Sequence, residues 1–190
     1  MVRRLSVVMP VYNEAATVGK AVRRVLATKI GDLKMEVVVV NDGSTDKTVA
    51  VLKKIKDKRV VIFNHKTNRG KGAAIRTALK KISGDVVVIQ DADLEYDPAD
   101  LTLLLVPILD GRADVVFGSR FVGSGPHRVL YFWHRLANQL ITFLCDCFSN
   151  LNLTDVETGY KAFTKEVAKK LKLTENGFGF DPEFTVKVAK

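Results

Sequence analysis

The stretch Asp85-Val-Val-Val-Ile-Gln-Asp-Ala-Asp-Leu-Glu95 joins a short apolar run to three acidic residues at alternate positions, Asp91, Asp93 and Glu95. The apolar run predicts a strand that is covered on both faces, as in a mostly parallel sheet. Carboxylates that lie close together repel one another, and a hard cation such as Mg²⁺ or Mn²⁺ often holds them together. The alternative is a polar loop whose acidic side chains face water, because short acidic motifs are common by chance.

Strand and helix patterns alternate on both sides of this stretch. Apolar runs predict strands at residues 5–11, 35–40, 60–63, 86–89 and 114–118. Periodic apolar positions predict helices after Asn13, at residues 49–55 and 73–82, and after Asp97-Pro98. Asn13 is expected to cap the first helix and Asp97 the fourth, with Pro98 at its first position. This alternation predicts an α/β domain with a largely parallel sheet.

Polar segments follow four of the predicted strands. They are Tyr12-Asn13-Glu14, Asp42-Gly43-Ser44, Asp91-Ala92-Asp93 and Ser119-Arg120. Ligands of open α/β sheets bind beyond the carboxyl ends of the strands, so we expect the four segments to converge on one crevice.

The pattern changes after Gly125-Pro126, where residues 129–151 form one strongly amphipathic helical pattern. One interpretation is a helix that packs on the sheet. The other is a helix whose apolar face lies in a membrane interface, which Tyr131 and Trp133 beside Arg128 and Arg135 would suit. Both interpretations remain open at the level of sequence.

The composition is that of a globular domain with an anionic partner. The 190 residues are 47% hydrophobic and 27% charged, with a formal net charge of +9. Such a charge favours nucleotide phosphates, nucleic acid or an acidic membrane surface, without choosing among them. Cys145 and Cys147 lack a second metal-ligand pair and are expected to be reduced packing residues. Since we find no secretory signal and no apolar run of about 18 residues, the cytosol is the expected compartment.

Three common chemistries do not fit the motifs. A dinucleotide-binding turn needs Gly-x-Gly-x-x-Gly, but Pro10-Val-Tyr-Asn-Glu-Ala15 occupies that place. The segment Gly70-Lys71-Gly72-Ala73 lacks the spacing and the hydroxyl of the ATPase phosphate-binding loop. Gly118-Ser119-Arg120 does not supply the Gly-x-Ser-x-Gly of a serine hydrolase. Metal-assisted handling of a phosphorylated ligand remains.

Five motifs carry a resemblance to a known family. They are Met9-Pro-Val-Tyr-Asn-Glu14, Val39-Val-Asn-Asp-Gly-Ser-Thr-Asp46, Asn68-Arg-Gly-Lys-Gly72, Asp91-Ala-Asp-Leu-Glu95 and Gly118-Ser-Arg-Phe121. In order and spacing they resemble the family 2 glycosyltransferases of GT-A fold, and within them the dolichol-phosphate mannose synthase and polyprenyl-phosphate glycosyltransferase branch. The resemblance covers nearly the whole chain. It implies a Rossmann-like α/β fold for nucleotide-diphospho-sugar transfer, with a mostly parallel central sheet and helices on both faces.

The resemblance also implies an enzyme and its partners. An inverting, metal-dependent hexosyltransferase would move mannose or glucose from a GDP- or UDP-sugar to a polyprenyl or dolichyl phosphate, using Mg²⁺ or Mn²⁺ and no nucleic acid. It would work as a peripheral protein at the cytoplasmic face of the membrane. Residues 1–190 would form one catalytic domain, in which 1–125 bind the nucleotide sugar and 126–190 form the acceptor side. Transfer to a polysaccharide or small-molecule hydroxyl, and a non-catalytic nucleotide-sugar-binding module, are the alternatives.

Site residues follow from matching positions. The nucleotide-sugar-binding set would be Pro10, Tyr12, Glu14, Val40, Asp42, Lys71, Asp91, Ala92, Asp93 and Arg120. Asp93 and Arg120 would be catalytic, and the metal ligands would be Asp93, Asp91 and Glu95, although mannose synthases usually have Gln in place of Glu95. Arg135 and Lys161 would bind donor or acceptor phosphate.

The acceptor decides whether a general base is needed. A phosphate monoester has a second pKa of about 6 and can attack the sugar unaided at neutral pH. A hydroxyl would need a carboxylate, for which Asp155 or Glu157 is the candidate, unless that residue only caps a helix. Acceptor identity stays open, because Glu157-Thr-Gly-Tyr-Lys161 replaces the branch's usual Thr-Ser-Gly-Phe-Arg. The branch normally continues past the helix that contains Phe180-Asp-Pro-Glu183, and the acceptor side is expected to lack that continuation.

Overall fold

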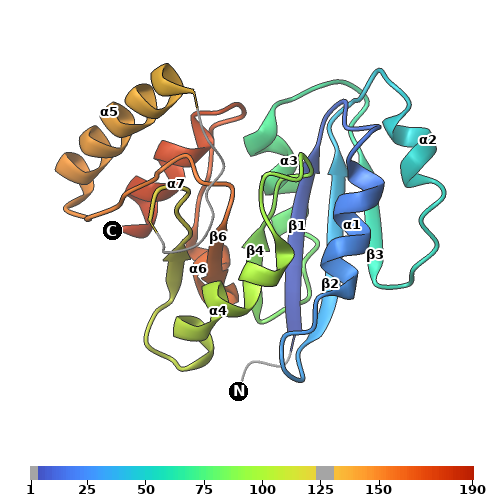
Figure 1. The fold of residues 1–190 in the computed structure, drawn as a ribbon, viewed down its shortest axis with the longest axis horizontal. Coiled ribbons are helices and arrows are strands. Elements are labelled where there is room, and N and C mark those ends of the chain that lie inside the picture. Colours follow the sequence, from blue (N-terminus) through green and yellow to red (C-terminus); the bar gives the residue numbers. More distant parts are fainter. Residues whose placement is uncertain (1–3, 123–130) are drawn as a thin grey trace.

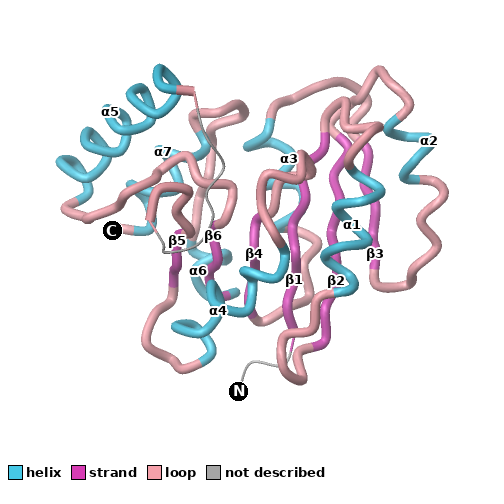
Figure 2. The backbone as a smooth tube through the Cα atoms, in the orientation of Figure 1, coloured by secondary structure: helices cyan, strands magenta, loops and turns pink. Residues whose placement is uncertain are grey.

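A mixed sheet forms the centre of the molecule (Figures 1 and 2). The computed structural model describes residues 4–122 and 131–190, and within them the strand order is β3-β2-β1-β4-β6-β5. The strands are β1 (Arg4–Val11), β2 (Lys34–Asn41), β3 (Val60–Asn64), β4 (Val86–Ile89), β5 (Val115–Phe117) and β6 (Lys161–Thr164). β1 to β4 run parallel, whereas β6 is antiparallel to both β4 and β5. The predicted α/β fold is confirmed, and β6 is an addition that the apolar pattern does not predict.

Helices cover both faces of the sheet (Figure 1). They are α1 (Val18–Ala27), α2 (Thr48–Leu52), α3 (Lys71–Leu79), α4 (Leu101–Leu109), α5 (Phe132–Ser149), α6 (Lys165–Lys170) and α7 (Phe180–Val188), and a 3₁₀ turn (Pro98–Asp100) precedes α4. One buried cluster joins the sheet to α1, α2 and α4, and the other joins it to α3 and α7. Apolar side chains removed from water on both faces are the main source of stability.

β4 is buried along its whole length, as its apolar run predicts. Val86 and Val88 point into the cluster with α1 and α4, whereas Val87 and Ile89 point into the cluster with α3 and α7. This alternation is the two-residue period of a strand between two layers. The chain leaves the sheet directly after β4, which brings Asp91 and Asp93 to its carboxyl edge.

The helix caps confirm one prediction and correct another. The Asp97 side chain accepts a hydrogen bond from the Ala99 N–H at 3.0 Å, as expected of a cap before Pro98. Asn13 is not the cap of α1, which begins only at Val18. Asn13 instead has a φ of 55°, and its side-chain oxygen accepts from the Thr45 N–H at 2.9 Å. Asn tolerates this left-handed backbone, and its side chain ties the loop after β1 to the loop after β2.

α5 packs by its polar face. Its buried residues are Asn138, Thr142 and Cys145, and it lies against α7 at the edge of the molecule (Figure 1). The apolar side chains point outward, and the most exposed are Tyr131, Phe132, Trp133, Leu140, Phe143 and Phe148. The interpretation of a helix packed on the sheet is therefore wrong. Among the residues that the structure describes, no helix is both long and apolar enough to cross a membrane.

Candidate active site

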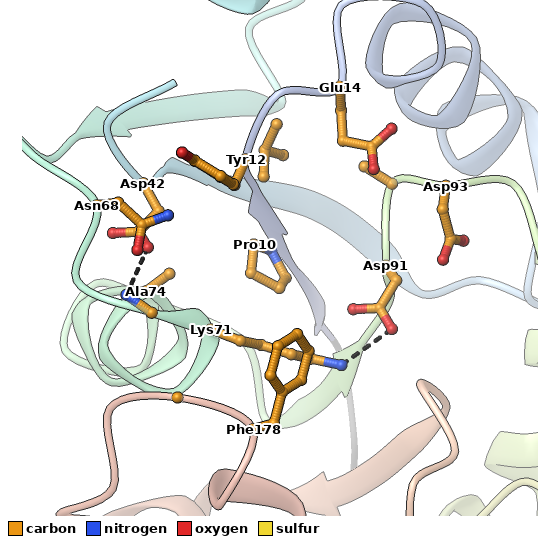
Figure 3. A pocket seen from close by; sticks show the side chains of 14 residues that line it. Pro10, Tyr12, Glu14, Asp42, Asn68, Lys71, Ala74, Asp91, Asp93 and Phe178 are labelled. Atoms are coloured by element: carbon orange, nitrogen blue, oxygen red, sulfur yellow. Dashed lines mark hydrogen bonds and ion pairs between the residues drawn. The ribbon is translucent and has the colours of Figure 1, made fainter. Parts of the chain in front are cut away.

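A pocket of about 570 Å³ opens at the carboxyl ends of β1, β2 and β4 (Figure 3). Eight of the predicted site residues line it: Pro10, Tyr12, Glu14, Asp42, Lys71, Asp91, Ala92 and Asp93. Asn68, Gly70, Ala74, Gly177 and Phe178 also contribute. The expected convergence therefore holds for three of the four polar segments, and the segment with Arg120 lies outside the lining.

Asp42 is the most heavily bonded acid at this edge. Its buried carboxylate accepts hydrogen bonds from the Arg69 N–H at 3.0 Å and the Gly70 N–H at 2.7 Å. His65 Nδ1 lies 2.6 Å from Asp42 Oδ1, and His65 Nε2 lies 2.9 Å from Thr77 Oγ1. An ionised carboxylate only accepts, so Nδ1 carries the proton. Asp42 therefore fixes the loop before α3, and these three donors leave about one of its four lone-pair sites to accept from a ligand in the pocket.

The loop before α3 approaches the segment before α7 very closely. A Cβ added to Gly70 would lie 2.3 Å from the Asn176 carbonyl oxygen, and one added to Gly72 would lie 2.3 Å from the Glu175 carbonyl oxygen. Gly70 also has a φ of 94°, which other residues rarely adopt. Both glycines are required for this contact, and the contact places Lys71 at the pocket.

Lys71 belongs to a row of alternating charges. Its Nζ lies 3.0 Å from Asp91 Oδ2 and 4.0 Å from Asp181 Oδ2, while Lys161 Nζ lies 2.5 Å from Asp181 Oδ1. Burial lowers the pKa of Lys71, but the two carboxylates outweigh it and raise that pKa overall. Lys161 is only 1% exposed, and it also donates to the Thr158 carbonyl. The structure therefore places Lys161 in the core and not at the pocket, away from any phosphate there.

Asp93 lies where negative charge accumulates. Desolvation and the neighbouring charges of Asp91, Glu95 and Glu14 raise the pKa of its carboxyl group. The Glu95 N–H donates to Asp93 Oδ1 at 2.9 Å, and Glu95 itself is outside the pocket lining. In the described part of the chain no three His, Cys, Asp or Glu side chains are grouped to hold a metal. The structure thus brings Asp91 and Asp93 to the pocket but does not gather them with Glu95 into the predicted set of three metal ligands. A cation such as Mg²⁺, which usually keeps water and substrate phosphates among its ligands, needs only one or two carboxylates from a protein.

Arg120 is held by a buried partner. Its Nε and Nη2 each lie 2.8 Å from an oxygen of Asp155, whose side chain is fully buried and also accepts from Asn138 Nδ2 at 3.1 Å. The hydrogen bonds that Arg120 donates to Asp155 raise the pKa of Arg120 despite desolvation, and the Glu95 charge also raises it. Asp155 is thus poorly placed to serve as a general base, whereas Glu157 is exposed.

The remaining predicted residues lie outside the pocket lining. Arg135 is exposed on α5, with its guanidinium 5.6 Å from the centre of the Phe121 ring, and Arg120 lies 5.7 Å from the same ring. Val40 is fully buried in the cluster with α3 and α7. The structure thus gathers Arg120 and Arg135 at one ring and leaves Val40 as a core residue.

Comparison with known proteins gives the family. Residues 6–172 match the sequence model of "Glycosyl transferase family 2". The protein belongs to glycosyltransferase family 2. This family 2 glycosyltransferase is 32% identical over 189 residues to the glycosyltransferase AglJ of Haloferax volcanii, covering 97% of this chain and 58% of the relative. It is 28% identical over 187 residues to a dolichol-phosphate mannosyltransferase of Pyrococcus furiosus, covering 97% of this chain and 53% of the relative.

Solved structures confirm the GT-A fold. Glucosyl-3-phosphoglycerate synthase of Mycobacterium tuberculosis, in complex with Mn²⁺ and UDP-glucose, aligns with a TM-score of 0.73 at 22% identity. The alignment covers 96% of this glycosyltransferase and 63% of the synthase. The chain thus spans little more than half the length of the two curated relatives above and somewhat less than two thirds of the synthase.

The sequence patterns missed Phe178, which lines the pocket, and they missed His65 and Asp181, which contact the lining residues Asp42 and Lys71. His65 directly follows β3, so applying the rule of strand ends to the third strand would have included it. Phe178 lies in the segment before α7, and Asp181 lies in the first turn of α7. Both are far along the chain from Lys71. No local pattern reveals such long-range contacts.

Proposed function

We propose that this glycosyltransferase moves a hexose, mannose or glucose, from a GDP- or UDP-sugar to the phosphate of a polyprenyl lipid with inversion at the anomeric carbon. The observation that carries the proposal is one pocket with two chemically different ends. Asp42 and Asn68 can hydrogen-bond a base or ribose, while Lys71, Asp91 and Asp93 suit a diphosphate with its cation. The UDP-glucose complex of the mycobacterial synthase and the name of the Pyrococcus relative support it.

The metal would be Mg²⁺ or Mn²⁺, held by Asp93 with help from Asp91. When bound, the cation neutralises charge on the departing diphosphate. Lys71 lies beside Asp91 and would add a second positive charge there. The Glu95 charge raises the pKa of Arg120, so a further cation lies within electrostatic reach of the acidic segment.

The acceptor would be a phosphate for two reasons. Two arginines lie at the Phe121 ring, and buried Asp155 is poorly placed to act as a general base. Arg120 and Arg135 both approach the Phe121 ring, and they would receive the acceptor phosphate. A phosphate oxygen attacks the anomeric carbon while the bond from that carbon to the donor diphosphate breaks. Residues 126–190 would form this acceptor side, apart from the loop with Phe178, which reaches the donor pocket.

The outward face of α5 would lie in the interface of the cytoplasmic membrane leaflet. Tyr131 and Trp133 are 81% and 73% exposed, and such amphipathic aromatic rings suit the headgroup level. Exposed Arg135 and the net charge of +9 would attract anionic lipid. A lipid-linked acceptor phosphate would then emerge close to Arg135, which is on the same helix.

A donor and acceptor panel tests the proposal. GDP- and UDP-linked mannose and glucose are each incubated with the protein, Mn²⁺ and either a short polyprenyl phosphate or a sugar that offers only hydroxyl groups, and glycosylated acceptor and free nucleoside diphosphate are measured. With the donor that the enzyme uses, we expect equal amounts of glycolipid and free nucleoside diphosphate. Transfer only to hydroxyl acceptors would favour the second candidate, a hydroxyl transferase with exposed Glu157 as its base. Donor binding without any turnover would show a binding module.

A further inference from the structure

We propose that Phe178 is a donor-binding residue whose ring packs against the nucleobase of the nucleotide sugar. The inference rests on the proposed function, since it deepens the role of the same pocket. Phe178 is 83% exposed, whereas Phe180, two residues later, is fully buried. An exposed apolar side chain is ordinary by itself. The inference therefore rests on where Phe178 lies in the pocket and on the contacts that hold its loop in place.

Phe178 forms a wall of the pocket together with Gly177. Figure 3 shows Tyr12 and Phe178 on opposite sides of Pro10, with the Phe178 ring drawn over the Lys71 side chain. Among the described residues, Tyr12 and Phe178 are the large apolar side chains that are both exposed and part of the pocket lining. Two aromatic side chains therefore border one space that a planar base could enter.

The backbone before Phe178 is fixed on α3. The Ala73 N–H donates to the Asn176 carbonyl at 3.1 Å, and the Arg76 guanidinium donates to the Glu175 carbonyl and to Asn176 Oδ1. The close approach of Gly70 and Gly72 locks the same segment. The loop is thus tied to the helix that begins at Lys71.

The same loop is also fixed on α7. The Glu183 carboxylate accepts from the Thr174 N–H at 2.8 Å and from the Glu175 N–H at 2.9 Å. After Phe178 the chain is anchored again by buried Phe180, which packs against Phe184 at a ring distance of 5.7 Å. The Phe178 ring is therefore presented on a supported loop. A binding group that is ordered beforehand loses little entropy when the ligand arrives.

The chemistry of the pocket favours the base as the group that Phe178 meets. Asp91 and Asp93 mark the end suited to phosphates, whereas Phe178 follows Gly177, which lies against Gly70, and the Gly70 N–H donates to Asp42 at the end suited to the nucleoside. An aromatic ring stacks on any nucleobase, because every base has a π-face, while the polar groups of the pocket bind its edge. Loss of one such contact corresponds to about a tenfold change in affinity.

Calorimetric titration with Mn²⁺ present tests this assignment with UDP, GDP and UDP-glucose. We expect Phe178→Ala to weaken the binding of UDP or GDP, whichever the wild type binds, about tenfold, and Phe178→Tyr to retain binding. Leu103→Ala removes another exposed apolar side chain, on α4, and should change nothing. Because Phe178 is exposed, the ligand-free melting temperature of Phe178→Ala should equal that of the wild type. Phe178→Leu, which keeps bulk without a ring, should lie between Ala and Tyr.

The outcomes separate the inference from the function on which it rests. Equal nucleoside diphosphate affinity in the wild type, Phe178→Ala and Phe178→Leu would overturn the inference. A loss seen with UDP-glucose but not with UDP would also overturn it, because the ring would then meet the sugar. A wild type that binds no nucleoside diphosphate would instead refute the proposed function.

Discussion

Arg120 and Asp155 form a charge pair in which one partner cannot reach water. The Asp155 side chain is fully buried, whereas the Arg120 side chain is 24% exposed. Removing one member of a buried pair costs more than the pair contributes, because it leaves an uncompensated charge. The role of Arg120 in chemistry therefore cannot be read from a single substitution.

We expect Arg120→Ala to lower the free energy of unfolding by about 3 kcal/mol, since it leaves Asp155 with Asn138 as a neutral partner. The double variant Arg120→Ala/Asp155→Asn should regain most of that loss. Urea unfolding measures both. Arg112→Ala, which breaks an exposed pair with Asp110, is the matched control and should be nearly neutral. If the stable double variant still transfers sugar at the wild-type rate, Arg120 is not catalytic; we expect at least a tenfold loss.

The proposed metal-binding role of Asp93 gives a second prediction. Mn²⁺ with a nucleoside diphosphate should raise the melting temperature, because a ligand that binds only the folded state stabilises it by about 2.7 kcal/mol at a hundred times its Kd. Asp93→Asn should lose most of this shift, and Asp110→Asn should keep it. A full shift in Asp93→Asn would remove Asp93 from the metal site.

α5 shows that an amphipathic pattern identifies a helix without saying what its apolar face touches. Asn138 links this helix to two neighbours, since it donates to Asp155 and accepts from the Glu157 N–H at 3.3 Å. These polar contacts hold α5 on the protein and leave the apolar side chains outward. Substitutions on the outer face should therefore leave the fold intact.

Vesicle flotation tests the outer face of α5. Trp133→Ser should reduce binding to neutral and anionic vesicles, and Leu103→Ser on α4 should not. High salt should remove only the contribution of anionic lipid, because screening shortens to about 3 Å at 1 M salt. Failure of the wild type to bind any vesicle would contradict a membrane role. Concentration-dependent dimerisation that Trp133→Ser abolishes would assign the face to a second copy of the chain.

The start of α7 gives a prediction for acid stability. Despite desolvation, hydrogen bonds from Lys187, Thr174 and Glu175 lower the pKa of Glu183 from 4.5 to about 2. Because this pKa is lowered on folding, the stabilisation is complete well above pH 4.5 and is lost as the pH falls towards 2. Glu183→Gln should flatten the fall of the melting temperature over that range. An unchanged pH profile would show that Glu183 contributes no acid-linked stability.

At the scale of the whole molecule, sequence reasoning succeeds where burial sets the pattern. The five predicted strands appear within a residue or two of their expected ends, and the rule of strand ends brings Glu14, Asp42 and Asp93 together. It fails where partners are distant in sequence. Nothing in the local pattern around Lys161 distinguishes a buried partner of Asp181 from a surface lysine at a phosphate. β6 was not predicted for a similar reason. It is a short strand that begins with lysine, and its pairing with β4 cannot be read from its own sequence.

The outward apolar face of α5 also has a practical consequence. Under the proposed function, attachment to a surface would use the side of α5 opposite Asn138 and Thr142, so it could change without altering the contacts that hold this helix on the protein. Replacing Phe132, Leu140 and Phe148 by glutamate or lysine would alter only groups that are at least 60% exposed, and it would leave Asn138 and Thr142 in place. Such a variant should behave as a well-dispersed enzyme that turns over detergent-free, short-chain acceptors in water, and natural variation on this face could adapt the same catalytic domain to different surroundings.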